Sequence, residues 1–364
     1  MAAAVLDPRA LNRATLARQL LLERVTLSPL DAVGRLVGLQ AQVPRDPYVA
    51  LWSRLEGFRA EELSTLLEER QVVRTVAMRA TIHLLASEDA LTIRPLVQPV
   101  LDAELARHPE HGPRLRDVDL RPALAAAREL LGDRPLTTTE LRAALAVRCP
   151  ELDAPAAAYA CRCLLALVQA PPRGLWGRSS TVRLATLEAW VGRALAAAPS
   201  LDKLVLRYLA AFGPATVADV ATWSRLTGLR PVLERLRPGL ATFHDERGRE
   251  LFDLPDAPRP DSETPAPPRF LPEYDNVLLS HADRSRFRAD GVRVRFAGLE
   301  GLGHGGVLHE GLFVGLWRVE DGALVVRHVS PLAAPARGAL AAEGRHLLGF
   351  LGEDGASVRF VRLR

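Results

Sequence analysis

The sequence predicts an α+β fold in which three repeated units of short helices, each closed by a β-hairpin, precede a β-rich C-terminal domain. Three observations predict this fold. A helix-capping pattern occurs three times, each occurrence leads into helices and then paired strands, and short strands follow a proline-rich stretch. The chain has 364 residues, enough for roughly two to four domains.

The repeated pattern is a hydroxyl residue followed three positions later by an acid. The hydroxyl can cap a helix N-terminus, and the acid can return a hydrogen bond to the cap. This pattern, a capping box, can occur once by chance. Three capping boxes at spacings of roughly 80 to 110 residues indicate a repeated module. The segments are Ser28–Asp31, Thr137–Glu140 and Thr216–Asp219.

Each box is followed by residues that favour helices and then a hairpin. Strands are expected at 71–78 and 81–85, within 175–184, and at 240–244 and 249–254. Two or three short helices with a two-stranded hairpin make a winged helix, a variant of the helix-turn-helix. The predicted winged-helix units cover residues 1–112, 113–195 and 196–256.

A proline-rich segment, Pro255–Pro272, separates these units from the last part of the chain. Its composition is typical of a linker or an irregular strap. Beyond it, short strands between glycine turns are expected at 292–296, 306–308, 312–319, 323–329 and 357–363, with a helix at 337–347. Residues 257–364 are therefore interpreted as the linker and a β-rich C-terminal domain.

Composition limits the classes of function. The net charge of +4 permits a polyanionic partner. Every basic residue except Lys203 is arginine, whose planar fork suits phosphates and base edges, although a coding bias would give the same count. No apolar run is long enough for a membrane helix and no separate apolar signal core is visible, so we expect a soluble cytoplasmic protein.

Cofactor chemistry has little support in the sequence. The three cysteines are interpreted as buried thiols, since a structural zinc site needs four ligands at organised spacing. The sequence contains no P-loop, nucleophile elbow or dinucleotide fingerprint. We expect neither a metal nor a cofactor.

Four groups of residues carry a resemblance to a known family. They are Leu39–Gln42, Met78–His83, Leu271–Asn276 with Ser280–Arg284, and Gly315–Arg318. Together, in this order and spacing, they resemble the bacterial winged-helix DNA glycosylases of the AlkZ and YcaQ type over nearly the full chain. The resemblance implies tandem winged helices wrapped around a concave DNA channel.

The resemblance also assigns a catalytic motif. YcaQ-like members carry glutamine, an aliphatic residue and aspartate, whereas AlkZ-like members end the motif with glutamine. Gln40-Ala41-Gln42 is similar to the second kind. This implies that Gln40 and Gln42 are catalytic and that the substrate is a bulky N7-alkylguanine adduct, including interstrand crosslinks. The implied role is DNA repair or self-resistance to a DNA-alkylating natural product.

Two glutamines suit that substrate chemically. A glutamine amide cannot act as a general base near neutral pH. Alkylation at N7 gives guanine a positive charge in advance, so the base leaves as a neutral molecule without acid assistance. Two amide carbonyls can hold a water beneath the anomeric carbon and direct their dipoles at the developing cation.

The local sequence predicts where the motif lies. Pro29 starts a helix with the apolar stripe Leu30, Val33 and Val37, and Pro44 disfavours helical angles at the residue before it. A helix end or a loop is therefore expected around Gln40 to Gln42, with both amides facing the DNA channel. Alternatively, both glutamines cap the helix end and bind solvent.

Further residues are candidates for DNA contact, and each also has a structural interpretation. Arg79 and His83 follow the first hairpin and can be a turn arginine and a buried histidine. Arginines on the hairpins of the second and third units can be solvated surface residues, as can the cluster after the linker. The DNA-contact candidates are Arg45, Arg79, His83, Arg178, Arg247, Arg249, His281, Arg284 and Arg286.

Three functions remain open on this sequence. The first is a monofunctional, metal-free DNA glycosylase that acts as a monomer on double-stranded DNA bearing alkylpurine lesions. The second is a non-enzymatic winged-helix DNA-binding protein or transcriptional regulator, which the absence of a long heptad stretch disfavours. The third is a winged-helix scaffold that binds another protein.

Overall fold

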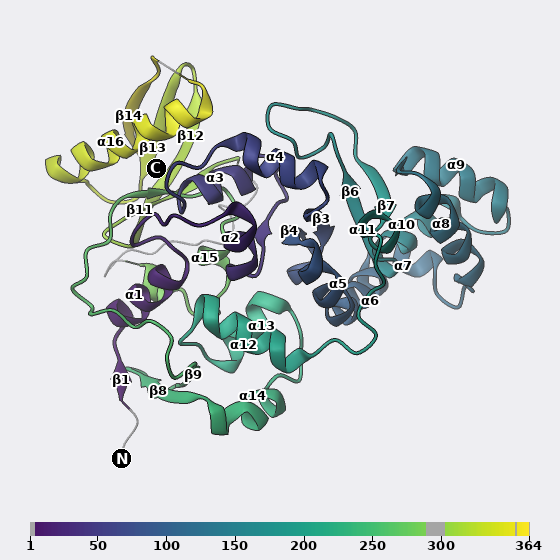
Figure 1. Ribbon diagram of the computed structural model, residues 1–364, viewed down its shortest axis with the longest axis horizontal. Coiled ribbons are helices and arrows are strands. Elements are labelled where there is room, and N and C mark those ends of the chain that lie inside the picture. Colours follow the sequence, from purple (N-terminus) through teal and green to yellow (C-terminus); the bar gives the residue numbers. More distant parts are fainter. Residues whose placement is uncertain (1–3, 289–302, 354, 364) are drawn as a thin grey trace.

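The computed structural model describes residues 4–288, 303–353 and 355–363 and, within them, combines helices with three β-sheets (Figure 1). The helices are α1 (Pro8–Arg18), α2 (Pro29–Arg35), α3 (Asp46–Trp52), α4 (Ala60–Glu68), α5 (Ser87–Leu96), α6 (Gln98–Arg107), α7 (His111–Arg114), α8 (Arg121–Asp133), α9 (Thr138–Arg148), α10 (Ala154–Leu164), α11 (Leu187–Val191), α12 (Leu201–Phe212), α13 (Val217–Ser224), α14 (Arg230–Leu236), α15 (Asn276–Leu279) and α16 (Ala334–Leu351). The strands are β1 (Val5–Leu6), β2 (Leu39–Gln40), β3 (Val72–Val76), β4 (Ile82–Ala86), β5 (Leu136–Thr137), β6 (Leu167–Ala170), β7 (Arg183–Thr186), β8 (Ala241–Asp245), β9 (Glu250–Asp253), β10 (Arg269–Phe270), β11 (Gly305–His309), β12 (Leu312–Glu320), β13 (Ala323–His328) and β14 (Ser357–Arg362).

Three runs of short helices each lead into an antiparallel pair of strands. The first run is α2–α4 before β3 and β4, the second is α8–α10 before β6 and β7, and the third is α12–α14 before β8 and β9. In Figure 1 the second run lies at the right, the third at the bottom and the C-terminal sheet at the upper left.

The predicted helix caps are confirmed. Ser28, Thr137 and Thr216 each accept a hydrogen bond from the N–H three residues ahead. In the second and third runs the acid returns a bond to the cap backbone, which completes a capping box. In the first run Asp31 instead accepts a bond from the Ser28 hydroxyl at 2.6 Å.

The first two runs share one six-stranded sheet, with strand order β2-β4-β3-β6-β7-β5. β3 pairs with β6 through Arg74 opposite Gln169 and Thr75 opposite Val168. The Thr75 hydroxyl also donates to the Leu167 carbonyl at 2.7 Å. The hairpins expected to be separate wings are thus joined edge to edge, which leaves neither β3 nor β6 as an exposed sheet edge.

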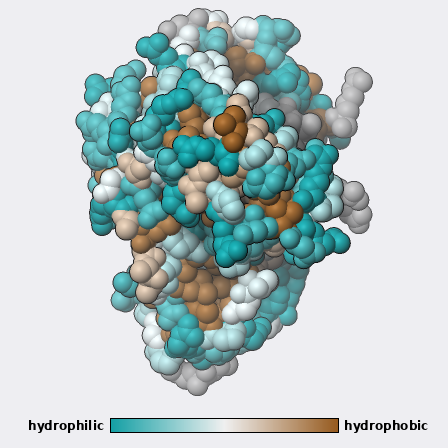
Figure 2. Space-filling view, turned by 90° about the vertical axis from the view of Figure 1, so that its right-hand side faces the viewer, coloured by the Kyte–Doolittle hydropathy of each residue, from teal (hydrophilic) through white to brown (hydrophobic). Residues whose placement is uncertain are grey.

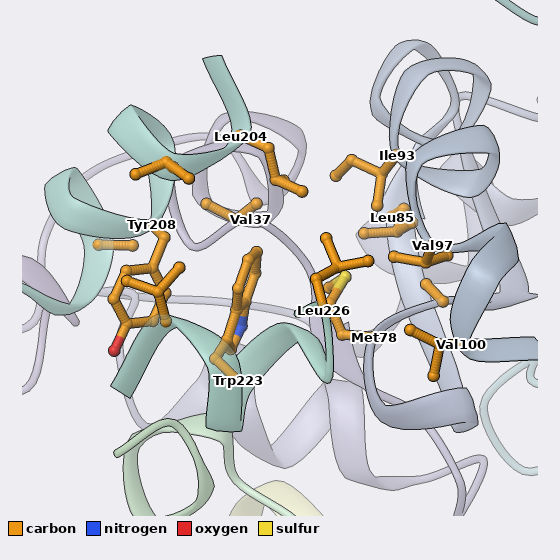
Figure 3. Close-up of a cluster of buried hydrophobic side chains, with 14 of the residues drawn as sticks. Val37, Met78, Leu85, Ile93, Val97, Val100, Leu204, Tyr208, Trp223 and Leu226 are labelled. Carbon is orange, nitrogen blue, oxygen red and sulfur yellow. The ribbon is translucent and has the colours of Figure 1, made fainter. Parts of the chain in front are cut away.

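Two apolar cores connect segments that are distant in the sequence. One core joins the first and third runs, and Figure 3 shows Trp223 of α13 between Tyr208 of α12 and Met78 of the turn before β4, with Val37 nearby. The other joins the first run to the C-terminal sheet, for example Leu39 with Trp317. The segments around the motif therefore depend on each other for burial.

The C-terminal prediction is largely confirmed. β10 to β14 form a five-stranded sheet in sequence order, and α16 packs against it. The expected linker lacks helix and strand except at its end, where β10 pairs with β11. The strand expected at 292–296 lies outside the described residues. The short β1, which pairs in parallel with β8, was not expected from the sequence.

The helix before the motif ends earlier than predicted. α2 stops at Arg35, and Val37 and Gly38 have positive φ values of 55° and 88°. The Gly38 N–H bonds to the Val33 carbonyl at 2.9 Å, a pattern that terminates helices with a left-handed residue. Gly38 also approaches Leu85 so closely that a Cβ would lie 2.3 Å from Leu85 Cδ2. The helix therefore stops through the left-handed residues Val37 and Gly38, well before Pro44.

The surface is mixed in character. Figure 2, which looks onto the end of the molecule that carries α8–α10, shows a mostly hydrophilic surface with hydrophobic residues in limited groups. Among the described residues, no helix combines the length and apolar character that crossing a bilayer requires.

Candidate active site

The Gln40-Ala41-Gln42 motif lies at the edge of the six-stranded sheet. Gln40 ends β2 opposite His83 of β4, and the Ala41 N–H continues the ladder to the Ile82 carbonyl at 2.8 Å. Gln40 is 6% exposed, whereas Gln42 is exposed. The motif thus begins in β2 and leaves it as a loop at Ala41 and Gln42. A loop was one of the two predicted conformations, whereas the other, a helix end, lies earlier, at Arg35.

Beyond the Ala41 N–H, side chains take part in the hydrogen bonds between the motif and the sheet. The Ile82 N–H donates to Oε1 of Gln42 at 3.3 Å, and the Ala41 carbonyl accepts from the Arg74 guanidinium at 2.8 Å. The Gln42 side chain therefore fixes the start of β4 while remaining accessible to solvent.

Arg79 is the main partner of Gln40. Its guanidinium donates to Oε1 of Gln40 at 2.6 Å and to Oδ1 of Asn276 at 2.7 Å. It also donates to the Trp223 carbonyl at 3.1 Å and lies 3.3 Å from Nε2 of His83. We call these five residues the Arg79 cluster. They come from the first run, the third run and α15.

His83 is a neutral member of the Arg79 cluster. Its Nδ1 lies 3.0 Å from the Thr81 carbonyl, which can only accept, so Nδ1 carries the proton and Nε2 accepts from Arg79. Burial, followed by the positive charge of Arg79, lowers the pKa of His83 to about 3. His83 is completely buried, so the expected direct DNA contact is wrong.

Arg74 holds the motif from the other side. Besides the Ala41 carbonyl, it donates to Oε1 of Gln169 at 3.2 Å. Burial lowers the pKa of Arg74 to about 10, still well above neutrality, so the guanidinium stays charged. The sequence did not single out Arg74. A single polar residue within an otherwise apolar strand is common, and it does not by itself indicate a role at a site.

A buried carboxyl group lies just after the motif. Asp46 is the first residue of α3 and accepts a bond from the backbone of Tyr274. Burial, and then the negative charges of Glu273 and Asp275, raise the pKa of Asp46 to about 8. Asp46 is therefore protonated at neutral pH, and sequence reasoning did not single it out.

The hairpin loop of the second run is docked on the rest of the molecule. The Tyr48 hydroxyl donates to the Gly174 carbonyl at 2.7 Å, and the Trp176 ring packs 5.0 Å from Tyr48 and 5.2 Å from Phe350 of α16. The Arg45 guanidinium lies 5.5 Å above the Trp176 ring. Arg45 and Arg178 are both exposed near this loop.

The hairpin of the third run exposes two of the expected DNA-contact residues. Arg247 and Arg249 lie at the β8–β9 turn and both pair with Asp283, at 2.9 and 2.6 Å. Asp283 precedes Arg284, which is half-buried. The structure thus brings this turn next to the segment after the linker.

Two expected DNA contacts are corrected by burial. His281 is 1% exposed and its Nε2 lies 3.0 Å from the Phe212 carbonyl. Arg286 is 5% exposed and donates to the Thr15 hydroxyl and the Pro214 carbonyl. Both side chains join α12 and α1 to the segment after the linker. Their hydrogen-bond partners lie inside the molecule, so neither side chain is at the surface.

The three cysteines lie inside the molecule. Cys149, Cys161 and Cys163 are free and buried, as predicted. Within the described ranges, no group of three or more His, Cys, Asp or Glu side chains has an arrangement suited to a metal ion.

The mixed helical and β architecture of this chain is similar to that of a solved structure. The solved structure of Streptomyces sahachiroi DNA glycosylase AlkZ superposes with a TM-score of 0.72 and 21% sequence identity, covering 99% of this chain and 100% of that one. At this identity the likeness shows a shared fold. A search of curated proteins found no match.

The family model described as "DNA glycosylase AlkZ-like" matches residues 33–350. The chain therefore belongs to the AlkZ-like DNA glycosylase family. It is a DNA glycosylase, an enzyme that hydrolyses the N-glycosidic bond between a base and its deoxyribose, and its substrate is DNA. This finding sets aside the regulator and scaffold interpretations.

Proposed function

We propose that this DNA glycosylase excises bulky N7-alkylguanine adducts, including interstrand crosslinks, with a water positioned by Gln40 and Gln42. The observation that carries the proposal is the chemistry around the two amides. Their oxygens accept from a guanidinium and a backbone N–H, neither of which can take a proton from water. With its pKa near 3, His83 is also a poor base at neutral pH.

Such a site favours a leaving group that needs no proton. An N7-alkylated guanine is already cationic, so breaking its glycosidic bond gives a neutral base. Positioning and fixed dipoles can then lower the barrier by several kcal/mol. Unmodified guanine needs protonation to leave, and these side chains do not offer it.

The proposed DNA surface uses the three runs as winged-helix units around a concave channel, in the divisions 1–112, 113–195 and 196–256, with 257–364 completing it. Exposed Arg45, Arg178, Arg247 and Arg249 are the proposed phosphate contacts. A crosslinked guanine stays tethered to the opposite strand, so full extrusion into a closed pocket is not available to it. The exposed Gln42 suits an open site of this kind.

The test uses duplex DNA carrying a single N7-alkylguanine. Incubation with the protein followed by alkali is expected to cleave the strand at the lesion. Gln40→Ala and Gln42→Ala are expected to lose at least about 100-fold in single-turnover rate while keeping their affinity for the duplex. Binding without abasic-site formation contradicts the proposed substrate, and wild-type rates in both variants place the chemistry elsewhere.

A further inference from the structure

The turn that carries Arg79 is held in an unusual conformation. Arg79 and Ala80, between β3 and β4, both have a φ of 58°. Two successive left-handed residues make a tight hairpin turn that normally selects Gly or Asn. A non-glycine residue in this conformation is strained, and backbone strain of this kind concentrates at functional sites.

The result of this turn is that the Arg79 side chain reaches Gln40. Four acceptors among the described residues surround the guanidinium and lie on separate elements: Gln40 on β2, His83 on β4, Asn276 on α15 and the Trp223 carbonyl on α13. Asn276 in turn donates from Nδ2 to the Gly38 carbonyl at 3.1 Å, two residues before Gln40. Gly38, Gln40, Arg79 and Asn276 therefore form a closed ring of contacts around β2.

The chemistry of arginine decides which way the Gln40 amide faces. A guanidinium has donors and no acceptor, so the amide atom 2.6 Å from it must be the oxygen. The NH2 group is then the opposite end of the amide. No hydrogen bond joins this NH2 group to any residue in the part of the chain that the structure describes.

We propose that Arg79 is a positioning residue that fixes the amide of Gln40 so that its NH2 group, and not its carbonyl, meets the nucleophilic water. This inference rests on the proposed function and refines its geometry. The water accepts from the Gln40 NH2 group through one lone pair and donates to Oε1 of Gln42, which keeps a lone pair beside its bond to Ile82. The second lone pair of the water is left for C1′.

The step balances without a base. The C1′–N9 bond breaks and its electron pair neutralises the cationic guanine. The water lone pair forms the new C1′–O bond, and the proton that the attacking oxygen then carries passes to bulk water. Arg79 touches neither base nor sugar in this arrangement and acts only through Gln40.

The first test separates the rate of excision from DNA affinity. Arg79→Lys keeps the positive charge but loses the planar guanidinium with its several donors, and Arg79→Ala loses both. On duplex DNA with one N7-alkylguanine, we expect the single-turnover rate to fall at least about 10-fold and 100-fold respectively, with dissociation constants within about threefold of wild type. Millimolar guanidinium chloride is expected to restore part of the rate of Arg79→Ala. Arg121→Ala, which removes an exposed arginine paired with Asp119, is the matched control.

A wild-type rate in Arg79→Lys overturns the proposal. A loss of DNA affinity that accounts for the whole loss of rate also overturns it, because Arg79 would then be a DNA contact. Asn276→Ala provides a second variant if Arg79→Ala fails to fold. It is expected to slow excision in the same direction, with less than additive effect when combined with Arg79→Lys.

The second test does not depend on excision. Selective ¹⁵N labelling of glutamine side chains gives an amide NH2 resonance pair for Gln40, assigned by its loss in Gln40→Ala. Arg79→Lys is expected to shift this pair toward the position of a freely rotating amide, and Arg121→Ala is expected to leave it in place. An unchanged pair in Arg79→Lys overturns the positioning role. If wild-type protein excises no base while the shift occurs, the proposed substrate fails and the positioning role stands.

Discussion

At the residue scale, burial sets the charge of the groups next to the motif. Asp46 has a pKa raised to about 8 by burial and by Glu273 and Asp275, whereas an aspartate in the unfolded chain titrates near its ordinary value of 3.8. Between these values the unfolded chain releases a proton that the folded protein retains. The contribution of Asp46 to stability is therefore complete at acid pH and is lost as the pH rises toward 8.

Asp46→Asn replaces this carboxyl group with an amide that cannot ionise. From pH 5 to pH 8, the free energy of unfolding of wild-type protein is expected to fall relative to that of Asp46→Asn, with a slope of at most about 1.4 kcal/mol per pH unit. Denaturant titrations of both proteins across this range measure the difference. A difference that does not change with pH means that Asp46 is ionised in the folded protein.

At the element scale, the position of β2 depends on how α2 ends. Gly38 has a φ of 88°, and a Cβ there would overlap Leu85 Cδ2 and lie 3.0 Å from the Leu84 carbonyl. Gly38→Ala is expected to lower the free energy of unfolding by about 2–3 kcal/mol and to slow excision, because strain and overlap displace the strand that carries Gln40.

Gly57→Ala is the matched control for this prediction. Gly57 has a φ of 63°, but nothing lies within 4 Å of its added Cβ. Gly57→Ala is expected to lower the free energy of unfolding by only about 1 kcal/mol, the cost of a left-handed alanine, and to leave excision unchanged. Equal losses of stability in the two variants, measured by chemical denaturation, mean that the approach of Gly38 to β4 has no energetic consequence.

At the scale of the whole molecule, the runs of helices share their cores and a sheet. Val37 and Trp223 lie in one core, Leu39 and Trp317 lie in another, and β3 pairs with β6. Large apolar interfaces make the parts unfold together, unlike domains joined by small polar contacts. We expect one cooperative transition, with coincident curves from far-ultraviolet circular dichroism and tryptophan fluorescence.

This test reports on most of the molecule at once. The tryptophans include Trp52 in the first run, Trp176 in the hairpin loop of the second, Trp223 in the third and Trp317 in the C-terminal sheet. Two resolved transitions, or a calorimetric enthalpy well above the van't Hoff value, would show that the runs unfold as separate units.

The sequence by itself determined the local structure of this protein. The three capped helix starts, the helix-then-hairpin order and most C-terminal strands follow from side-chain preferences that act within a few residues. The motif residues and the family resemblance were also visible in the sequence. In each case the information lies in neighbouring positions.

Only the tertiary structure decided what surrounds the motif. The bonds from Arg79 to Asn276 and from Arg74 to Gln169 span 197 and 95 positions, so no local pattern reveals them. The inward turn of His83, His281 and Arg286 depends on which segments pack above them. Polar residues in a strand or loop look alike in sequence whether they face DNA or a neighbouring carbonyl, because burial is a property of the packed chain.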